Sequence, residues 1–588
     1  GRLFYLQVVE YDIYAPRSDR NSLRNVTIPA SRGLVFDRNG RVLAENEPIF
    51  TLILTPINFD TTRFGLLSNL MNLPEQEIRS RYRDAIRYSW HRPSVLASDI
   101  SFERFSIVEE NIWQLPGVGS QIDFKRNYPS AVRASHVLGY LREAAKEDID
   151  RNPEIEAGER VGKSGIELVY DQELRGRPGA RTIRINALGQ AIGRMEETEL
   201  NHPADPGRSI TLTLDSELQQ LAETLMEGKS GAVVVMNPKT GELLAFVSSP
   251  QPMLDRLAGR LDRAYWTQVN QDTLTPLFNR AISSRQPPGS TVKPIMGIIG
   301  QHMGLVDPDR KVYNPGAYYR GRAYQDLAPP GDYNLRDAIT QSSNTYFLEI
   351  MDRIASRNRL NEWSSLMRDF GFGTETDVDM PFETAGLLPD SLTLDRHFGK
   401  RKWGVGDVLN LGIGQGVFSV TPMQLTVATS IIANRGVRVQ PHVVRAIGDP
   451  ESSFTRVVPQ LDSLEWAKPS YFEPVIEGMR GVIKKESSRY LLDVPGMDLA
   501  GKTGTAQNSS GISHGWFTGF APADDPVLTV TVFIEKGGFG SLSAAPIASL
   551  LTEHHLTGEI KREHVLRHVR EYSAPKPVSS ASQTGNAP

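Results

Sequence analysis

A serine and a lysine three residues apart form the first pair in this sequence that could do chemistry. Ser290 and Lys293 follow the stiff turn Pro287-Pro288-Gly289, and Pro294 comes next. Proline is tolerated in a first helical turn, so the pattern predicts a buried helix that starts near Ser290. Residues three apart share a helix face, so Lys293 can reach Ser290. A serine needs a base to become a nucleophile, and a lysine with a lowered pKa can be that base.

A second motif, Ser342-x-Asn344, follows about fifty residues later. The hydroxyl of Ser342 can relay a proton between Lys293 and a leaving amine. The amide of Asn344 can orient Lys293 and bind a substrate amide. Ser-x-Asn is also a common helix cap, so the motif alone does not establish a site.

The third motif is the strand-like segment Lys502-Thr503-Gly504-Thr505. Side chains alternate on a strand, so Thr503 and Thr505 share one face, where their hydroxyls and the charge of Lys502 suit a carboxylate. Gly504 lets substrate backbone lie against the strand. A tetrahedral oxyanion needs two donors, and the backbone N–H groups of Ser290 and Thr505 are the natural candidates. Each motif is weak alone, but the three in this order indicate acyl transfer.

Composition limits the other function classes. The chain has 588 residues, which predicts two or three domains, and a net charge of −4, which gives no nucleic-acid footprint. The absence of cysteine excludes disulfides, cysteine-based zinc sites and thiol catalysis. No run of apolar residues is long enough for a transmembrane helix. The first residues, from Arg2 to Val9, are typical of the end of a longer helix, so we expect a membrane anchor upstream.

The pattern along the chain predicts a multidomain α/β (α+β) protein. Strands are expected at 32–44, around an Asn-Gly turn, and at 50–54, and a helix follows in which Ile78, Tyr82 and Ile86 form an apolar stripe. A linker is expected at 201–207. Beyond it, strands come from both ends of the second half, with helices between them. The predicted units are a juxtamembrane helix remnant at 1–15, a non-catalytic domain at 16–208, a catalytic domain at 209–556 and a largely disordered tail at 557–588.

The three motifs together resemble the penicillin-binding and serine β-lactamase superfamily. Several segments of the first third resemble the non-catalytic domain of class B penicillin-binding proteins, and they lie at 32–37, 126–129, 136–140 and 165–167. The segments Ile413-Gly414-Gln415-Gly416, 421–424 and 433–436 resemble the elongation type, penicillin-binding protein 2. The segment 251–255 departs from the family pattern. The resemblance implies a transpeptidase domain with an antiparallel sheet flanked by helices, and an extended N-terminal pedestal.

The activity that the resemblance implies is that of a peptidoglycan D,D-transpeptidase. Ser290 attacks the penultimate D-Ala carbonyl of a stem peptide, Lys293 takes its proton, and terminal D-Ala leaves. An amine of a neighbouring stem peptide then resolves the acyl-enzyme, and β-lactams acylate the same serine. No cofactor is implied. Some relatives bind zinc through a cysteine, which this sequence lacks, so no metal is expected.

The resemblance also implies partners and a place in the cell. The partners are peptidoglycan stem peptides and lipid-linked nascent glycan, a SEDS-type glycosyltransferase of the rod-shape system and the scaffold protein MreC. The location is the inner membrane, with one N-terminal anchor and a periplasmic catalytic domain. We expect the first third to act as a lever that couples these partners to the transpeptidase through the stripe of Ile78, Tyr82 and Ile86.

Other functions use the same motifs. A serine β-lactamase needs a group that activates water for deacylation, and none is identified. A β-lactam sensor needs a signalling domain. A division-type transpeptidase and a scaffold with inactive motifs are the remaining alternatives.

Overall fold

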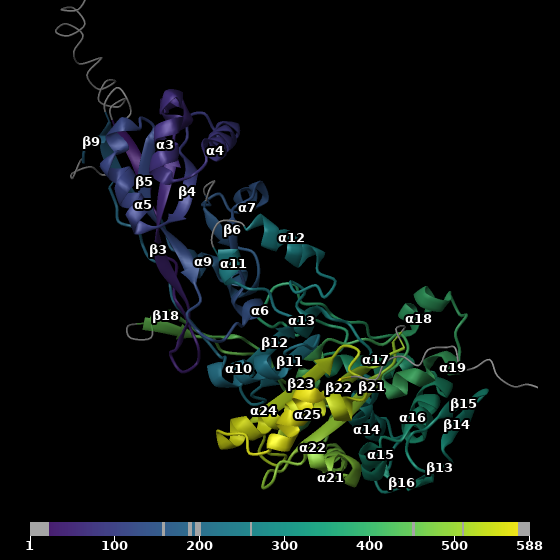
Figure 1. Ribbon diagram of the computed structural model, residues 1–588. Coiled ribbons are helices and arrows are strands. Elements are labelled where there is room, and N and C mark those ends of the chain that lie inside the picture. The colour runs from purple at the N-terminus through teal and green to yellow at the C-terminus, as the bar shows by residue number, and fades with distance from the viewer. Residues whose placement is uncertain are drawn as a thin grey trace, which may run out of the picture.

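The computed structural model describes residues 23–155, 159–185, 191–194, 201–258, 262–449, 453–508 and 511–573. The molecule is elongated, and the first third of the chain extends away from a larger body formed by the rest (Figure 1). No helix in these ranges is long and apolar enough to cross a membrane. The predicted helix remnant at 1–15 lies outside the described residues, as do residues 574–588 of the predicted tail.

A small sheet covered by helices forms the far end of the first third, which we call the head. The strand β3 (Val42–Leu54) lies between β4 and β5 and pairs antiparallel with both. Leu52 and Leu54 are fully buried, because alternate residues of the strand face the helices. The neighbouring elements are β4 (Ser94–Ile100), β5 (Val118–Asn127), α3 (Phe64–Met71), α4 (Glu75–Tyr88) and α5 (Phe102–Glu110).

The helix predicted from the apolar stripe is α4, and its stripe faces inward. Ile78 is only 1% exposed, and the ring of Tyr82 packs edge-on against that of Phe64, with 5.3 Å between centroids. Ile78 belongs to the core of the head, Tyr82 is partly buried and packs against it, and Ile86 is partly exposed. The helix prediction is confirmed, but the expectation that the whole stripe is a surface for a partner is wrong, because the head itself buries Ile78 and covers part of Tyr82.

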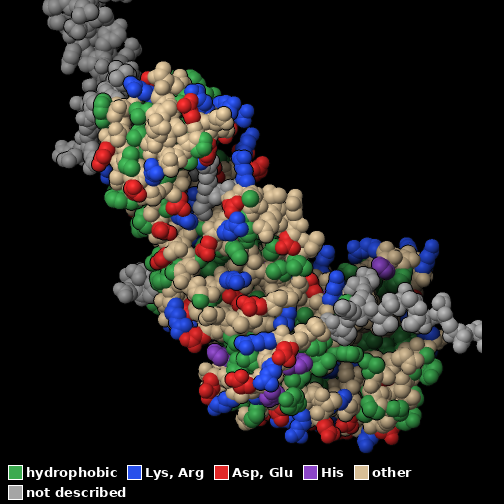
Figure 2. Space-filling view, in the orientation of Figure 1, with side chains coloured by type: hydrophobic (Ala, Val, Ile, Leu, Met, Phe, Trp, Pro, Cys, Tyr) green, Lys and Arg blue, Asp and Glu red, His purple; other side chains and the backbone are tan. Residues whose placement is uncertain are grey.

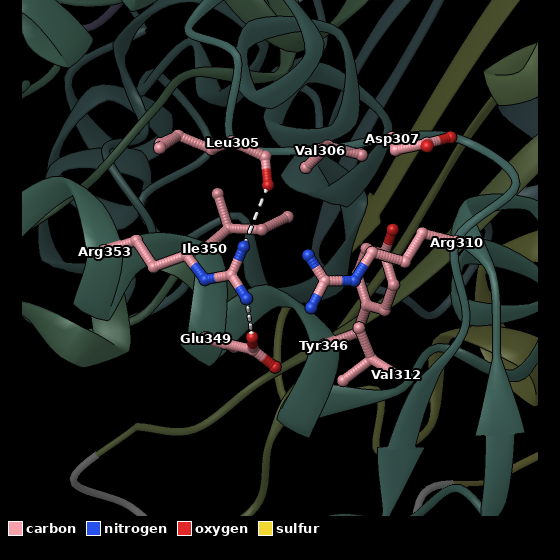
Figure 3. Close-up of a pocket in the computed structure, with 9 residues that line it drawn as sticks. All are labelled: Leu305, Val306, Asp307, Arg310, Val312, Tyr346, Glu349, Ile350 and Arg353. Atoms are coloured by element: carbon pink, nitrogen blue, oxygen red, sulfur yellow. Dashed lines mark hydrogen bonds and ion pairs between the residues drawn. The ribbon is translucent and has the colours of Figure 1, made fainter.

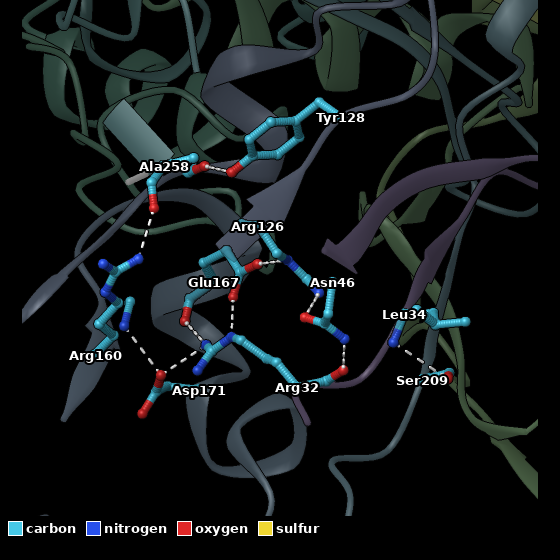
Figure 4. A network of polar contacts seen from close by, with 12 residues as sticks. Arg32, Leu34, Asn46, Arg126, Tyr128, Arg160, Glu167, Asp171, Ser209 and Ala258 are labelled. Carbon is cyan, nitrogen blue, oxygen red and sulfur yellow. Dashed lines mark hydrogen bonds and ion pairs between the residues drawn. The ribbon is translucent and has the colours of Figure 1, made fainter. Parts of the chain in front are cut away.

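Short elements and buried charged groups connect the head to the larger body. Glu167 accepts hydrogen bonds from Arg32 Nε at 2.5 Å and from Arg126 Nε at 2.8 Å, and Arg32 also donates to Asp171 at 2.7 Å (Figure 4). We call these four residues the pedestal charge cluster. Burial opposes the charge of Glu167, but Arg126 and Arg32 hold the pKa of this carboxyl below its ordinary value. The elements around the cluster are β6 (Leu141–Glu143), β7 (Arg160–Gly162), α6 (Ser135–Leu138), α7 (Lys146–Arg151), α8 (Gly165–Val169) and α9 (Asp171–Arg175).

One sheet continues from the first third into the second half of the chain. The strand β2 (Val35–Phe36) pairs antiparallel with β3 and parallel with β10 (Ile210–Leu212). In turn, β10 pairs with β18 (Val444–Asp449), and β19 (Ser453–Arg456) closes the sheet. Backbone hydrogen bonds therefore join the two predicted domains.

The predicted linker at 201–207 is also paired. His202 and Asp205 form bridges with Ala180 and Arg177, next to a sheet of β1 (Leu23–Ile28), β8 (Gly179–Ile185) and β9 (Ala191–Arg194). The segment predicted as a linker is therefore held to the first third by backbone pairing.

A side-chain contact reinforces the connection between the halves. The hydroxyl of Tyr170, at the end of α8, donates to Asp379 at 2.9 Å. The same carboxylate accepts from the backbone N–H groups of Val443 at 2.6 Å and Val444 at 2.9 Å. The buried carboxylate thus links the first third to the start of β18.

A five-stranded antiparallel sheet organises the second half, and its strands come from both ends of that segment, as predicted. Both faces are covered, because Val233 and Val235 enter one core while Ala232 and Val234 enter another. In sheet order the strands are β12 (Leu243–Ser249), β11 (Gly231–Met236), β23 (Leu528–Ile534), β22 (His514–Ala521) and β21 (Ala500–Ala506).

Helices from the chain's end cover one face of this sheet. Val565 and Val569 are buried in its core, so the segment 563–571 is a packed helix and the prediction of a disordered tail is wrong there. The helices of this face are α10 (Ser216–Leu225), α24 (Ala545–Thr557) and α25 (Glu563–Glu571). Helices of the other core are α14 (Lys293–His302), α15 (Leu335–Gln341), α16 (Asn344–Ser356), α17 (Leu360–Asp369), α20 (Pro422–Ala433) and α21 (Glu473–Lys484).

Smaller elements complete the body, whose visible face mixes acidic and basic side chains (Figure 2). The short helices are α11 (Asp255–Ala258), α12 (Arg263–Gln271), α13 (Arg280–Ser283), α18 (Ser391–Phe398), α19 (Val405–Val408), α22 (Glu486–Leu492) and α23 (Gly540–Ser543). The paired short strands are β13 (Val312–Asn314) with β16 (Gly331–Tyr333), β14 (Ala317–Arg320) with β15 (Arg322–Gln325), and β17 (Val437–Val439) with β20 (Leu461–Ser463).

Candidate active site

Ser290 lies in a tight turn, Gly289–Val292, directly before α14. The backbone N–H of Lys293 donates to the carbonyl of Ser290, and Pro294 occupies the first helical turn as predicted. Gly289 has a φ of 58°, and a Cβ there would lie 2.9 Å from the carbonyl oxygen of Thr505. The turn therefore needs glycine and brings Ser290 beside β21. Ser290 is half-buried, and its hydroxyl makes no hydrogen bond within the described ranges.

Lys293 is completely buried and carries no ion pair with any described residue. Its Nζ donates to the carbonyl oxygen of Ser342 at 2.7 Å and to Asn344 Oδ1 at 2.8 Å. Burial lowers the pKa of Lys293 to about 7, although the charge of Asp326 opposes this shift. A substantial fraction of Lys293 is therefore neutral near pH 7 and able to accept a proton.

Ser342 lies between two lysines. It ends α15 in the left-handed region, with a φ of 60°, a strained conformation for a residue other than glycine. Its Oγ accepts from Lys293 Nζ at 3.3 Å and from Lys502 Nζ at 3.1 Å. The hydroxyl can pass a proton between groups on either side, because it is both donor and acceptor.

Lys502 is almost as deeply buried as Lys293. It is 1% exposed, and its Nζ also donates to the carbonyl oxygen of Thr503 at 3.1 Å. Burial lowers the pKa of Lys502 well below its ordinary value, and the positive charges of Lys293 and Lys485 lower it further. The two lysines that contact Ser342 therefore oppose each other's protonation.

The remaining residues of β21 alternate as predicted, with Thr503 and Thr505 partly exposed and Gly504 buried. The expected reason for Gly504 is wrong. A Cβ at Gly504 would lie 2.8 Å from the carbonyl oxygen of Pro288, so the missing side chain makes room for the turn before Ser290. Substrate would meet the other face of the strand.

The outer edge of β21 is free within the described sheet, because β21 is the terminal strand. The carbonyl oxygen of Thr505 accepts from Gln415 Nε2 at 3.3 Å, so it points away from β22. In an antiparallel strand the N–H and C=O of one residue point to the same side. The N–H of Thr505 therefore faces the side on which Ser290 lies, which is the geometry that an oxyanion site needs.

Comparison with known proteins now decides the family. The model for the penicillin-binding protein transpeptidase domain matches residues 231–553, and the model for the penicillin-binding protein dimerisation domain matches residues 27–212. This chain belongs to the penicillin-binding proteins. Its relatives place it in class B, with the elongation-type penicillin-binding protein 2.

Three similar proteins support this placement of the penicillin-binding protein. The peptidoglycan D,D-transpeptidase MrdA of Haemophilus influenzae is 31% identical, over 97% of this chain and 90% of the relative. Penicillin-binding protein 2 of Helicobacter pylori, solved in complex with MreC, superposes with a TM-score of 0.77 at 27% identity, over 91% of this chain and 99% of the other. A chain of a peptidoglycan synthase complex that coordinates polymerization and crosslinking superposes with a TM-score of 0.73 at 28% identity, over 95% of this chain and 96% of the other.

Asp326 is a residue of this penicillin-binding protein that sequence reasoning missed. Its carboxylate accepts from Ser343 Oγ and from the backbone N–H of Thr345, both at 2.7 Å, and so fixes the start of α16 beside Asn344. Burial opposes its charge, but backbone N–H groups, including those of Asn344 and Thr345, hold its pKa below the ordinary value. A lone aspartate between two short strands gives no signal in a sequence.

A pocket on another side of α16 does not belong to the active site. Arg310 and Arg353 point toward one another across it, and Arg353 is paired with Glu349 (Figure 3). Its volume is about 20 Å³, which holds about one water molecule. In the described part of the chain, no group of three or more His, Asp or Glu side chains could hold a metal ion.

Proposed function

We propose that this penicillin-binding protein cross-links peptidoglycan as a D,D-transpeptidase of the elongation type, with Ser290 as nucleophile. The observation that carries the assignment is the buried Lys293, which has no carboxylate partner in the described chain and has a pKa of about 7. Such a lysine is costly to a fold and suited to a general base.

The reaction proceeds in two acyl transfers. Oγ of Ser290 attacks the carbonyl carbon of the penultimate D-Ala while Lys293 accepts the hydroxyl proton, and the N–H groups of Ser290 and Thr505 hold the oxyanion. The C–N bond then breaks, and Lys293 passes its proton through Ser342 to the leaving amine, with Lys502 on the far side of Ser342. An acceptor amine attacks the ester and loses a proton to Lys293. The ester C–O bond breaks, and Lys293 returns this proton to Oγ of Ser290.

Substrate recognition uses the free edge and face of β21. The hydroxyls of Thr503 and Thr505 and the ammonium of Lys502 bind the terminal carboxylate, and Asn344 binds a backbone amide. Each hydrogen bond to a charged group contributes roughly 1.5–3 kcal/mol. Replacing both threonines by valine therefore slows acylation steeply, and parent-like rates in the double variant would move the carboxylate site elsewhere.

The deciding experiment is intact-mass spectrometry after incubation with penicillin. One adduct is expected on the peptide that contains Ser290, and none in Ser290→Ala. The adduct should persist, since a transpeptidase releases penicillin slowly, whereas rapid loss of the adduct would favour a serine β-lactamase. An adduct in Ser290→Ala would exclude the assigned nucleophile.

We also propose that the protein is held at the inner membrane by an N-terminal anchor, with its transpeptidase domain in the periplasm, and acts with MreC and a SEDS-type glycosyltransferase. A solved relative in complex with MreC and another within a peptidoglycan synthase complex support this. Since the head covers much of the α4 stripe, we propose exposed apolar residues of the head as the surface for a partner, namely Val95, Phe102 and Ile122.

The test of this surface reconstitutes the anchored protein with the glycosyltransferase and measures glycan polymerisation. Phe102, which is 68% exposed, can be changed to Asp without disturbing the core of the head. The variant should lose activation of polymerisation and keep penicillin acylation. Unchanged polymerisation in variants of all three residues would exclude this surface.

A further inference from the structure

Lys485 is a cation beside the active site that belongs to none of the three motifs. It lies between α21 and α22 and is half-buried. The helix α21 packs so closely against α15 that a Cβ at Gly481 would lie 2.1 Å from Oγ1 of Thr340. Thr340 precedes Ser342 by two residues, so this end of α21 lies next to the proton-relay serine.

The ammonium group of Lys485 has no hydrogen-bond or ion-pair partner among the residues that the structure describes. The preceding residue, Lys484, instead donates to Asp493 at 2.8 Å. Burial lowers the pKa of Lys485. The charge of Lys485 also lowers the pKa of Lys502. Burial is the largest cause of that lowered pKa, and the positive charges of Lys293 and Lys485 add to it.

Lys293 and Lys502 thus contact Ser342, the charge of Lys485 acts on Lys502, and none of the three lysines is paired with a carboxylate in the described chain. The hydrogen bonds of Lys502 go to Ser342 and to the backbone of Thr503, so two of its three donors are used within the protein. Lys485 is the most accessible of the three. Asp326 acts on Lys293 but pairs with none of the three lysines, so an anion that binds on the face of Thr503 would add negative charge to this region.

We propose that Lys485 attracts the carboxylate of the acyl donor and is a specificity-determining residue of the reaction. The inference rests on the proposed function, because that function supplies a substrate with a carboxylate. It divides the work between two lysines. Lys502 contacts Ser342 and the bound carboxylate at short range, while Lys485 provides long-range attraction for anionic substrates.

A structural role for Lys485 predicts different behaviour. A lysine kept for packing contributes through its methylene stem, and its loss would affect every substrate equally and lower stability. A lysine kept for its charge distinguishes a carboxylate from its neutral ester and acts less strongly in salt. These two differences define the test.

The experiment measures the second-order acylation rate of Ser290 by a penicillin and by the methyl ester of the same penicillin, in the parent and in Lys485→Gln. We expect the acid to react about tenfold more slowly in the variant, because the variant lacks the unit charge that attracts the carboxylate. The ester should react at the parent rate. The acid's rate should fall with added salt in the parent and stay nearly flat in Lys485→Gln.

The matched control is Lys484→Gln, which removes the adjacent lysine and should leave both rates unchanged. Lys485→Arg should restore most of the rate with the acid. The inference is overturned if Lys485→Gln matches the parent with the acid, or if acid and ester slow by the same factor. Failure of the proposed function would look different, because the parent itself would then form no adduct at Ser290.

Discussion

The pedestal charge cluster and the active site both bury charged groups, but they balance them differently. In the cluster, Arg32 and Arg126 face the carboxylate of Glu167 at 2.5 and 2.8 Å. In the active site, Lys293 and Lys502 are 0% and 1% exposed and have no carboxylate partner in the described chain. Paired charges lock the fold, whereas unpaired ones cost free energy and persist where a reaction uses their lowered pKa.

The largest effect on stability is expected from removing the negative charge of Glu167 in the pedestal charge cluster. Glu167→Gln keeps the shape but leaves two buried guanidinium groups short of a counter-charge. We expect the free energy of unfolding to fall by roughly 3–5 kcal/mol, measured by denaturant titration. Glu110→Gln, at an exposed site of the head, is the control and should stay within about 0.5 kcal/mol of the parent. A small effect at Glu167 would mean that the cluster does not lock the fold.

The next effect is on the acylation rate and comes from replacing the unpaired Lys293. Lys293→Arg keeps the positive charge, but a guanidinium does not lose its proton in proteins. Penicillin acylation should slow by about two orders of magnitude or more, because general-base catalysis is removed. The measurement is stopped-flow acylation, with circular dichroism to show that the variant is folded. Near-normal acylation would identify another base.

A change of opposite sign is expected when the unpaired lysine is replaced by an apolar residue. Lys293→Met should raise the free energy of unfolding by about 1–2 kcal/mol at pH 7 while it abolishes acylation. This contrasts with the loss expected for Glu167→Gln. A destabilised Lys293→Met would contradict the idea that the lysine is held at a cost.

The stability gain of Lys293→Met should depend on pH, because the pKa of Lys293 is lowered in the fold. The pKa of Lys293 is about 7 in the fold, against an ordinary lysine value of 10.5. Between these values the unfolded chain binds a proton that the folded chain does not, so the parent gains stability as pH rises. The advantage of Lys293→Met should therefore shrink across this window, and an advantage that grows with pH would refute the assignment.

The smallest effect tests a third kind of buried charge. Asp379 has hydrogen-bond donors and no cation in hydrogen-bond contact within the described chain, and burial raises its pKa. Tyr170→Phe removes one of its three donors and should cost about 1 kcal/mol of stability. Acylation of Ser290 should not change. A loss of acylation in Tyr170→Phe at full stability would show that this contact also acts on the active site.

Local sequence patterns were sufficient to predict those features that depend on residues close together in the chain. The turn before Ser290, the helix that holds Lys293 and the alternation of Thr503 and Thr505 were all predicted from residues a few positions apart. The contact of Ser342 with Lys502 was not predicted, because the two are 160 positions apart and no local pattern joins them.

The missed features are those that distant segments create. Asp326 acts through contacts with Ser343 and Thr345, on another element, and nothing in its own neighbourhood marks it. The apolar stripe of α4 shows a different limit. A stripe predicts that one face of a helix is covered, but not whether the same chain or a partner covers it.

The continuous sheet through β3, β2, β10 and β18 has a mechanical consequence. A force applied to the head reaches the catalytic half through the backbone hydrogen bonds that join these strands. The hydrogen bonds of one strand pair share this force, so they break together and not one after another. The connecting strand β2 has only two residues, paired with β3 on one side and β10 on the other. A tilt of the head must therefore carry β10 and β18 with it or break the few hydrogen bonds of β2.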